Sequence, residues 1–574
     1  MTLSLIRESQ VALRAAAKRW LEQDPDPKTR EELSALIEAA GDLNAPGEAI
    51  ADSDDSPRAQ AWRSLRDRFA TRLQFGTAGL RGRQEAGPNR MNRVTVAQAA
   101  RGLADFLLER GNAPTAVIGY DGRTNSDVYA RDSAELMQAA GVRAVLMPRP
   151  LPTPVLAFAV RHLQAAAGVM VTASHNPKWD NGYKVYLGNE DAGSQIVPPA
   201  DAEIAAAIER VATTMRVNEL PRSSEYHEVS ETLIDSYVLE TAKVLRSQPT
   251  DLKVAYTAMH GVGWETFARV LDEAGVSRPA TVDAQLHPDG NFPTVDFPNP
   301  EEPGALDLAY ETASAAGAQL IIAHDPDADR LAVAVPARDG GWHRFGGNDI
   351  GKLLGWRAAK LLAEQGARGT LATSLVSSPA LSAVAERYGL DYVETQTGFK
   401  WISRAPQIAY GYEEALGYLV NPDTVRDKDG ISAAMASLDL AFTQDREGKS
   451  LLDLDDEFTA EFGAFESRQV AIRYEDATQL PAVMARLRAK APTVVGEVDV
   501  AEFYDFETAQ SPANILRLRL TDGTRIMIRP SGTEPKIKVY IDAVSTDGSV
   551  DARREAAAGQ ADAAATAMRE LLTS

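Results

Sequence analysis

Residues 165–177 read AAAGVMVTASHNP, and this stretch shows the pattern on which most of the chain is built. An apolar run from Ala165 to Val171 leads into a short polar turn that ends at Pro177. A continuous apolar run bounded by turn residues is typical of a buried strand. Because ligands of parallel α/β sheets gather at the carboxyl ends of strands, Ser174 in this turn is the first candidate functional residue.

The same pattern recurs along the chain. Apolar runs precede turns in TAVIGYDGR (115–123), GVRAVLMP (141–148), LKVAYTAMHGVGW (252–264) and AQLIIAHDPDADR (318–330), and helical patterns lie between them. Such alternation is the signature of βαβ units on mostly parallel sheets. The sequence therefore predicts an α/β fold.

The two ends of the chain depart from this alternation. Residues 1 to about 70 have helical spacing and are expected to pack on the rest of the protein. In residues 517–543, two short strands meet at Asp522-Gly523 and a third follows, which favours antiparallel pairing. A last helix is expected to place Ala564 and Met568 on one face.

We therefore expect three doubly wound mixed α/β domains and a C-terminal α+β domain. The predicted boundaries are 1–222 for a helical extension with a serine-loop domain, 223–340, 341–465, and 466–574 for the terminal domain. A length of 574 residues accommodates four domains, each with its own core.

The composition excludes several classes of protein. The chain has no cysteine, so covalent catalysis has to use another nucleophile, and disulfides and thiolate metal sites are excluded. A net charge of −21 argues against nucleic acid or an anionic membrane as a partner, because both need an extended basic surface. No long apolar run and no signal-peptide pattern is present, so a cytoplasmic protein is expected.

Ser174 has three interpretations. It could cap a helix or close a turn. It could be the nucleophile of a hydrolase elbow G-x-S-x-G, but Thr172 and Asn176 occupy the glycine positions and exclude this. It could also accept a phosphoryl group, with Lys184 in NGYKVY supplying a positive charge.

The turn HDPDADR carries three carboxylates at alternate positions, Asp325, Asp327 and Asp329. Three carboxylates in one concave turn suit a hard divalent cation such as Mg²⁺. An EF-hand is excluded, since Arg330 and Pro336 stand where Gly and Glu are required. A haloacid-dehalogenase-type phosphatase motif also fails, because Asp329 replaces its Thr or Val. A solvated acidic loop stays open as an alternative.

Three further loops carry candidate binding groups. GYEEALGY offers two acceptor side chains for sugar hydroxyls, and RPSGTEPKIK offers the donors that a phosphate needs; a surface glutamate pair and an ordinary polar hairpin are the alternatives. FGTAGLRGR adds Arg81 and Arg83 in a glycine-rich setting. The candidate residues are Glu413, Glu414, Arg529, Ser531, Gly532, Thr533, Lys538 and Arg81.

Taken together, these loops resemble the α-D-phosphohexomutase superfamily, which includes phosphoglucomutases and phosphomannomutases. The resemblance runs from about Phe75 to the end of the chain. TASHNP resembles the phosphoserine loop, DPDADR the metal loop, YEEALG the sugar-recognition loop and RPSGTEP the phosphate-binding loop, in family order. Four motifs in order at domain-sized spacing are hard to obtain by chance.

The resemblance implies four domains around one central cleft and a role for each candidate. Ser174 would be phosphorylated, and its phosphate would hold Mg²⁺ together with the three aspartates. The other catalytic residues would be Arg81 and Lys184 beside the phosphate, His175, and the proton-transfer residue Lys428 in DKDG. The substrate-binding set would be Glu413, Glu414, Lys400 in TGFKW, Arg529, Ser531, Gly532, Thr533 and Lys538.

One position departs from the commonest family pattern. Many relatives read Gly-Glu-Glu-Ser where this chain has Tyr412 to Ala415, so one hydroxyl that would meet the sugar is missing. The helical N-terminus and several loops more closely resemble the subgroup of phosphoglucomutases related to phosphopentomutases and glucose-1,6-bisphosphate synthases.

The expected activity is that of a phosphoglucomutase, an isomerase of carbohydrate metabolism that interconverts glucose 1-phosphate and glucose 6-phosphate. It would work through phosphoserine and a reorienting 1,6-bisphosphate, with sugar 1,6-bisphosphate as activator, as a monomer or homodimer. Phosphopentomutase, phosphomannomutase and bisphosphate synthase activities are the alternatives. A sugar-phosphate phosphatase and a non-catalytic sensor are more distant ones.

Overall fold

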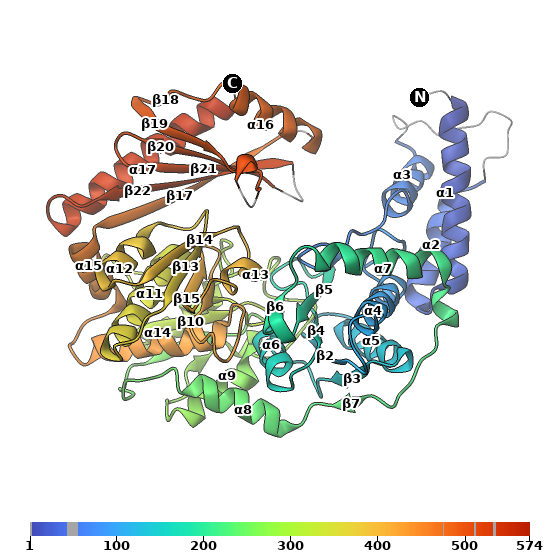
Figure 1. The fold of residues 1–574 in the computed structure, drawn as a ribbon, viewed down its shortest axis with the longest axis horizontal. Helices are drawn as coiled ribbons and strands as arrows, with labels where there is room; N and C mark the ends of the chain where they lie inside the picture. Colours follow the sequence, from blue (N-terminus) through green and yellow to red (C-terminus); the bar gives the residue numbers. More distant parts are fainter. Residues whose placement is uncertain (1–2, 43–54, 475, 510–511, 532–534, 574) are drawn as a thin grey trace. The chain divides into compact units, whose positions relative to one another are not determined.

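The computed structural model describes residues 3–42, 55–474, 476–509, 512–531 and 535–573 (Figure 1). The chain divides into two compact units. Unit 1 contains Met1–Leu245, Lys253–Ala332 and Asp423–Met435, and unit 2 contains Arg246–Leu252, Val333–Pro422 and Ala436–Ser574. None of the helices in these described ranges has both the length and the apolar character needed to cross a membrane.

Three helices open the chain, as the helical spacing predicts. They are α1 (Leu3–Gln23), α2 (Pro27–Ala40) and α3 (Pro57–Phe69). Asp26 caps α2 and Ser56 caps α3, each accepting a backbone N–H of the first turn, and a proline begins both helices. Trp20 and Trp62 are buried in the same apolar core as the first sheet, so the extension is part of unit 1.

The first sheet carries the serine loop. Its strands are β1 (Leu80–Arg83), β2 (Thr115–Tyr120), β3 (Arg143–Leu146), β4 (Ala167–Val171), β5 (Asp180–Leu187), β6 (Ser194–Gln195) and β7 (His227–Glu228). They are ordered β1-β5-β4-β2-β3-β7, with β6 on β5. Strands β3, β2 and β4 are parallel, and β5 is antiparallel to β4. The helices are α4 (Arg93–Leu108), α5 (Ser126–Ala140), α6 (Thr153–His162) and α7 (Ala200–Thr214).

The second sheet carries the aspartate loop. Its strands are β8 (Val254–Thr257), β9 (Ala280–Thr281), β10 (Leu320–His324), β11 (Leu331–Pro336) and β12 (Trp342–Arg344), in the order β12-β11-β10-β8-β9. Strand β8 is parallel to both β10 and β9. The associated helices are α8 (Glu231–Ala242), α9 (Gly263–Glu273) and α10 (Asp307–Ala316). The aspartate loop joins β10 to β11.

The third sheet lies in unit 2. Its strands are β13 (Thr370–Ser374), β14 (Asp391–Thr395), β15 (Ile408–Glu413) and β16 (Gly417–Leu419), in the order β14-β13-β15-β16. Strands β14, β13 and β15 are parallel and β16 is antiparallel. The helices are α11 (Gly347–Glu364), α12 (Ala380–Tyr388), α13 (Phe399–Ile402), α14 (Gly430–Asp445) and α15 (Leu451–Phe462). The first turns of α14 belong to unit 1.

The fourth sheet is antiparallel throughout. Its strands are β17 (Ala464–Arg473), β18 (Val494–Val495), β19 (Val498–Asp505), β20 (Leu516–Leu520), β21 (Arg525–Pro530) and β22 (Lys536–Ser545), in the order β17-β22-β21-β20-β19-β18. Two helices, α16 (Leu480–Ala489) and α17 (Val550–Thr573), accompany it. Ala564 and Met568 of α17 are buried in its core, as the helical spacing predicts.

The predicted fold class is confirmed: three mixed α/β domains are followed by an α+β domain. Each of the five apolar runs that the sequence marks as strands forms one, namely β2, β3, β4, β8 and β10. The hairpin at Asp522-Gly523 joins β20 to β21, which pair antiparallel as expected. Five short 3-10 helices complete the described elements, at Asn189–Asp191, Val217–Glu219, Asp283–Gln285, Ala477–Gln479 and Phe506–Thr508.

Candidate active site

Ser174 lies in the turn after β4, and its hydroxyl is buried within unit 1. Its Oγ donates a hydrogen bond to Oδ2 of Asp325 at 2.8 Å, and Nδ1 of His175 lies 3.3 Å from Ser174 Oγ. The backbone of Ser174 is left-handed, with φ at 51°, a conformation that costs an L-residue roughly 1–2 kcal/mol. The turn therefore holds the serine in an unfavourable conformation that directs its hydroxyl at the aspartate loop.

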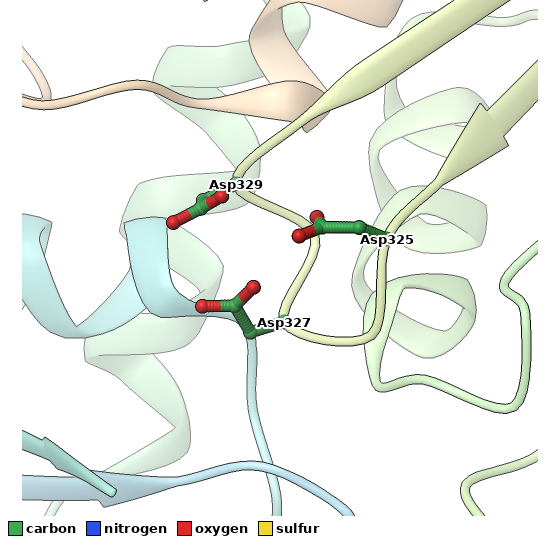
Figure 2. A group of neighbouring side chains, drawn as sticks. All are labelled: Asp325, Asp327 and Asp329. Carbon is green, nitrogen blue, oxygen red and sulfur yellow. The ribbon is translucent and has the colours of Figure 1, made fainter. Parts of the chain in front are cut away.

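The three aspartates lie in the loop between β10 and β11 and are fully buried. Figure 2 shows their carboxylates turned toward one another across the concave side of this loop. One oxygen from each of Asp325, Asp327 and Asp329 lies within 4.8 Å of the others, a spacing at which one ion can be held. The three side chains that the sequence groups by alternate spacing thus share one small space.

Two lysines and a threonine surround this carboxylate cluster. Lys184 Nζ donates to Asp327 Oδ2 at 2.7 Å and to Asp329 Oδ2 at 2.8 Å. Lys428 Nζ lies 2.7 Å from the same Oδ2 of Asp329, and Thr153 Oγ1 donates to Asp327 Oδ2 at 2.6 Å. The positive charge of Lys184 is thus paired with Asp327 and Asp329, while Ser174 donates to the third aspartate of the cluster, Asp325.

Two glycines explain how these segments come so close. A Cβ on Gly430 would stand 2.3 Å from the carbonyl oxygen of Arg330, and one on Gly261 would stand 2.4 Å from that of Pro326. Real Cβ contacts are not that short, so only glycine fits at either position. The glycine of DKDG therefore lets the segment bearing Lys428 lie directly against the aspartate loop.

The buried charges determine which carboxyl is protonated most readily. Burial raises the pKa of Asp325, and the neighbouring Asp327 and Asp329 raise it further. Burial acts the same way on Asp327, but the ammonium groups of Lys184 and Lys428 outweigh it and hold its pKa below the ordinary value. The pKa of Lys184 is raised, because its two aspartates outweigh its own burial. The cluster is therefore mostly ionised, with Asp325 its weakest acid.

The residues fit a divalent cation. Oδ1 of Asp327 and Oδ1 of Asp329 are buried and accept no hydrogen bond from any described residue. A buried carboxylate oxygen without a donor is costly, and bound cations are the usual partners of such groups. Hard oxygen ligands are the type that Mg²⁺ takes.

Three more charged or titratable groups complete the site in unit 1. Arg81 donates to the side chain of Asn176 in the serine turn at 3.2 Å. The backbone N–H of Arg330 donates to Asp325 Oδ1 at 3.1 Å. The pKa of His175 lies well below its ordinary value, because burial and the charges of Arg330 and Arg81 disfavour the imidazolium. His175 is therefore neutral near pH 7.

A second group of candidates lies in unit 2. Glu413, the last residue of β15, accepts the N–H of Gly398 at 2.7 Å, and Arg529 donates to Thr397 Oγ1 at 2.9 Å. These contacts bring the loop GYEEALGY, the segment TGFK and the C-terminal domain together. Lys400 stands two residues after Gly398, in the short helix α13.

The two neighbouring glutamates differ in their surroundings. The carboxylate of Glu414 accepts from the hydroxyls of Ser374 at 3.2 Å and Ser377 at 3.0 Å. Its backbone N–H donates to the same Ser377 hydroxyl at 3.1 Å. Glu414 is thus held within the third domain by serines, whereas Glu413 is held at the start of the segment TGFK.

The phosphate-loop candidates are partly described. Arg529 and Lys538 are direct partners across β21 and β22, and the N–H of Ser531 donates to the carbonyl of Lys536 at 2.8 Å. The predicted residues Gly532 and Thr533 lie outside the described residues. The described members of the predicted set therefore fall into two groups, one in each unit.

Several residues that lie beside the first group are not among the candidates that the sequence patterns select. Thr153 and Thr172 carry no chemical signal beyond being polar residues near strand or helix ends. Asp121 and Arg123 directly follow β2 in the run TAVIGYDGR, and the same strand-end argument that selects Ser174 applies to them. Asp121 Oδ2 accepts from Thr172 Oγ1, which in turn accepts from the N–H of Ser174.

Fold and site together define a sugar-phosphate mutase. Four domains of the phosphoglucomutase/phosphomannomutase family match this chain in order. They are α/β/α domain I at residues 72–215, domain II at 235–340, domain III at 347–462 and the C-terminal domain at 470–560. The chain belongs to this family, and it is an isomerase that transfers a phosphoryl group within a sugar phosphate.

Three curated relatives carry different sugar names. A probable phosphomannomutase of Haemophilus influenzae is 53% identical, over 80% of this chain and 94% of that protein. A probable phosphoribomutase of Schizosaccharomyces pombe is 34% identical, over 92% of this chain and 93% of that protein. A phosphoglucomutase of Staphylococcus haemolyticus is 34% identical, over 82% and 90% respectively. The family is thus shared, while the sugar varies among the relatives.

Proposed function

We propose that this mutase interconverts glucose 1-phosphate and glucose 6-phosphate by passing phosphate through Ser174. One observation carries the proposal: a buried serine hydroxyl donates to a carboxylate of the Asp325, Asp327 and Asp329 cluster, beside Lys184 and Lys428. A nucleophile, candidate metal ligands and compensating cations are the components that phosphoryl transfer requires.

The proposed half-reactions balance as follows. With phosphate on Ser174, a free hydroxyl oxygen of the sugar monophosphate attacks phosphorus; a P–O bond to the sugar forms and the P–Oγ bond breaks. The sugar hydroxyl loses its proton to Nζ of Lys428 in the neutral amine form. The resulting sugar 1,6-bisphosphate turns over, and Ser174 Oγ, which left with the electron pair of the broken P–Oγ bond, attacks the other phosphorus. The P–O bond from that phosphorus to the sugar breaks, the released sugar oxygen takes the proton back from Nζ of Lys428, and the phosphoenzyme is restored.

The unit 1 residues have separate tasks in this scheme. Asp325, Asp327 and Asp329 would hold Mg²⁺ together with the seryl phosphate, and the ion would neutralise charge on the transferring group. Lys184 fixes two of the three carboxylates. Arg81 donates a hydrogen bond to Asn176 of the serine turn. It would thereby place its positive charge beside the phosphate.

The unit 2 residues would bind the part of the substrate that does not react. We propose that Arg529, Ser531, Thr533, Gly532 and Lys538 grip the distal phosphate and that Glu413 accepts hydrogen bonds from sugar hydroxyls, with Glu414 and Lys400 beside it. Because a bisphosphate that reverses end for end meets this grip with either phosphate, the grip has to recognise phosphate rather than one end of the sugar. The four domains would meet at a central cleft, with boundaries near residues 222, 340 and 465.

Mannose 1-phosphate is the second candidate substrate. The 53% identical relative bears the name phosphomannomutase, and glucose and mannose differ only in the orientation of the C2 hydroxyl. A pentose phosphate is the third, because a relative that spans 92% of this chain bears the name phosphoribomutase. Bisphosphate synthesis and phosphate hydrolysis are the remaining outcomes of the same phosphoenzyme.

A substrate panel tests the proposal. Purified enzyme receives Mg²⁺, a trace of the matching sugar bisphosphate, and the 1-phosphates of glucose, mannose, glucosamine or ribose. We expect the highest kcat/KM with glucose 1-phosphate, strong stimulation by glucose 1,6-bisphosphate and little inorganic phosphate. A higher kcat/KM for mannose or ribose would assign the alternative sugar, and continuous phosphate release would show a phosphatase.

The proposal also covers the location, the partners and the oligomeric state of the enzyme. A cytoplasmic enzyme is consistent with a chain without cysteine. The acidic net charge of −21 favours a small-molecule substrate over nucleic acid or a membrane surface. Monomer or homodimer is the expected state, and gel filtration with light scattering distinguishes the two.

A further inference from the structure

A buried arginine lies behind the serine turn, in a place to which the proposed mechanism gives no role. Arg123 follows β2, and its side chain is completely buried. Its guanidinium donates to four backbone carbonyls of one segment. The acceptors are the carbonyl oxygens of Ser174 and Asn176 at 2.5 Å, of Pro177 at 2.9 Å and of Asp180 at 3.2 Å.

These four bonds account for the shape of the turn. Buried carbonyls need donors; the N–H of Asp180 reaches the carbonyl of Pro177 within the turn, and the Arg123 guanidinium supplies a donor to each of the four. The planar guanidinium carries five N–H donors in a fixed geometry, which allows a single side chain to serve all four. Arg123 therefore takes the place of the backbone partners that a regular strand would supply.

Asp121 contacts Arg123 directly and is linked through Thr172 to the N–H of Ser174. It is buried, lies 3.4 Å from Nε of Arg123, and accepts the Arg123 backbone N–H at 3.0 Å. Its other carboxylate oxygen accepts from Thr172 Oγ1 at 2.7 Å, and Thr172 Oγ1 accepts the N–H of Ser174 at 2.8 Å. Both the N–H and the carbonyl of Ser174 are thus bonded to side chains that Asp121 connects.

This arrangement holds the serine in its left-handed conformation. A residue with φ near 50° returns to a more favourable conformation unless its surroundings fix both of its peptide groups. Release of either contact would rotate Ser174 Oγ away from Asp325 Oδ2, to which it now donates at 2.8 Å. Misplacement of a reacting atom by about 1 Å costs on the order of 100-fold in rate.

We propose that Arg123, Asp121 and Thr172 form a clamp that positions Ser174 for phosphoryl transfer, so that they are positioning residues of the reaction. The clamp rests on the proposed role of Ser174. It acts through the backbone on the nucleophile and touches neither sugar nor phosphate. Its loss therefore lowers kcat and leaves KM for the sugar phosphate nearly unchanged.

Two variants of the full-length enzyme test the clamp from opposite sides. Arg123→Lys keeps the positive charge but removes the planar guanidinium that donates to the four carbonyls. Thr172→Val keeps the side-chain shape and removes the hydroxyl that accepts the N–H of Ser174, whereas Thr172→Ser retains it. The matched control is Arg93→Lys, which breaks a partly buried two-bond pair with Asp132 in the same domain but away from the serine turn.

The readouts are kcat and KM for glucose 1-phosphate, the rate at which glucose 1,6-bisphosphate phosphorylates Ser174, and the melting temperature. We expect kcat and the phosphorylation rate to fall about 100-fold in Arg123→Lys and Thr172→Val. KM should stay within about threefold, and Thr172→Ser should restore most of the rate. Arg93→Lys should lower the melting temperature and keep kcat.

Two results overturn the clamp. One is a kcat in Thr172→Val equal to that of the wild-type enzyme. The other is a fall in kcat in both variants that is no larger than the fall in Arg93→Lys when the melting temperatures are equal. That result would make Arg123 a purely structural residue. If Arg123→Lys does not fold, the pair Thr172→Val and Thr172→Ser decides alone. A wild-type enzyme that never phosphorylates Ser174 would instead defeat the proposed function, so the two failures are distinguishable.

Discussion

Lys184 and Lys428 meet at one atom: both ammonium groups lie within 2.8 Å of Oδ2 of Asp329. Lys184 comes from β5 and Lys428 from the segment before α14, so two distant parts of the chain neutralise a single buried carboxylate. The segment of Lys428 is anchored by its neighbour Asp427, which accepts from Tyr186 at 2.9 Å and Gln195 at 2.7 Å. The two lysines nevertheless have different proposed tasks, structural for Lys184 and proton transfer for Lys428.

Replacement of Lys428 tests that difference. Loss of a general acid–base group typically costs about 10²–10⁴-fold in rate, so Lys428→Ala should lower kcat by this amount with a smaller effect on KM. Lys428→Arg keeps the positive charge beside Asp329 but cannot give up a proton near neutral pH, so its kcat should stay low. An arginine variant with nearly wild-type kcat would show that the lysine serves only as a charge.

Arg529 should act on binding rather than on chemistry. Hydrogen bonds to charged groups contribute about 1.5–3 kcal/mol, so Arg529→Ala should raise KM for the sugar monophosphate about 10- to 100-fold. Arg519→Ala is a matched control, because Arg519 lies on β20 of the same domain and is more than half exposed. Steady-state kinetics of the two variants decide the matter. Equal KM values in both would remove Arg529 from the phosphate grip.

Arg525 should contribute to stability within unit 2. Its buried guanidinium donates to Asp542 at 2.8 Å and to Glu394 at 2.8 Å, and also to the carbonyl of Ser377. Removal of one partner from a buried ion pair typically costs about 3–5 kcal/mol, since the remaining charges are left buried. Arg525→Met should therefore lower the midpoint of urea unfolding clearly. A midpoint equal to that of the wild-type protein would contradict this assignment.

Mg²⁺ should stabilise the folded protein through the aspartate cluster. A ligand that binds only the native state raises stability as its concentration exceeds Kd, and the two donor-free oxygens of Asp327 and Asp329 supply the site. Added Mg²⁺ should raise the melting temperature of the wild-type enzyme, and excess chelator should abolish turnover. Asp327→Asn should lose most of this thermal shift. A shift of wild-type size in the variant would place the ion elsewhere.

Much of the fold could be predicted because strand-and-turn patterns are local. The run before Ser174 and the run before Asp325 both form strands, since buried apolar residues bounded by turns have few other solutions. The alternate spacing of the aspartates also defines a local cluster. The unequal surroundings of Glu413 and Glu414 could not be predicted, because they depend on serines and a glycine from other strands and loops.

The clamp behind Ser174 shows the same limit. Asp121 and Arg123 stand in a run that the sequence marks as a strand end, yet their partners lie more than 50 residues later in the chain. Spacing within one segment cannot show that four carbonyls of another segment turn toward a guanidinium. The predicted common cleft for Ser174 and Arg529 likewise concerns residues of separate units and stays a prediction.

The covalent role of Ser174 is the central claim, and phosphoenzyme formation tests it most directly. Dephosphorylated enzyme is mixed with glucose 1,6-bisphosphate and Mg²⁺, and peptide mass spectrometry locates any phosphate, for the wild-type protein and for Ser174→Ala. We predict one phosphoryl group on Ser174, transferred to glucose 1-phosphate at least as fast as the enzyme turns over, and an inactive alanine variant. Ser174→Ala with turnover near the wild-type rate, or a phosphate located on another residue, would contradict the account.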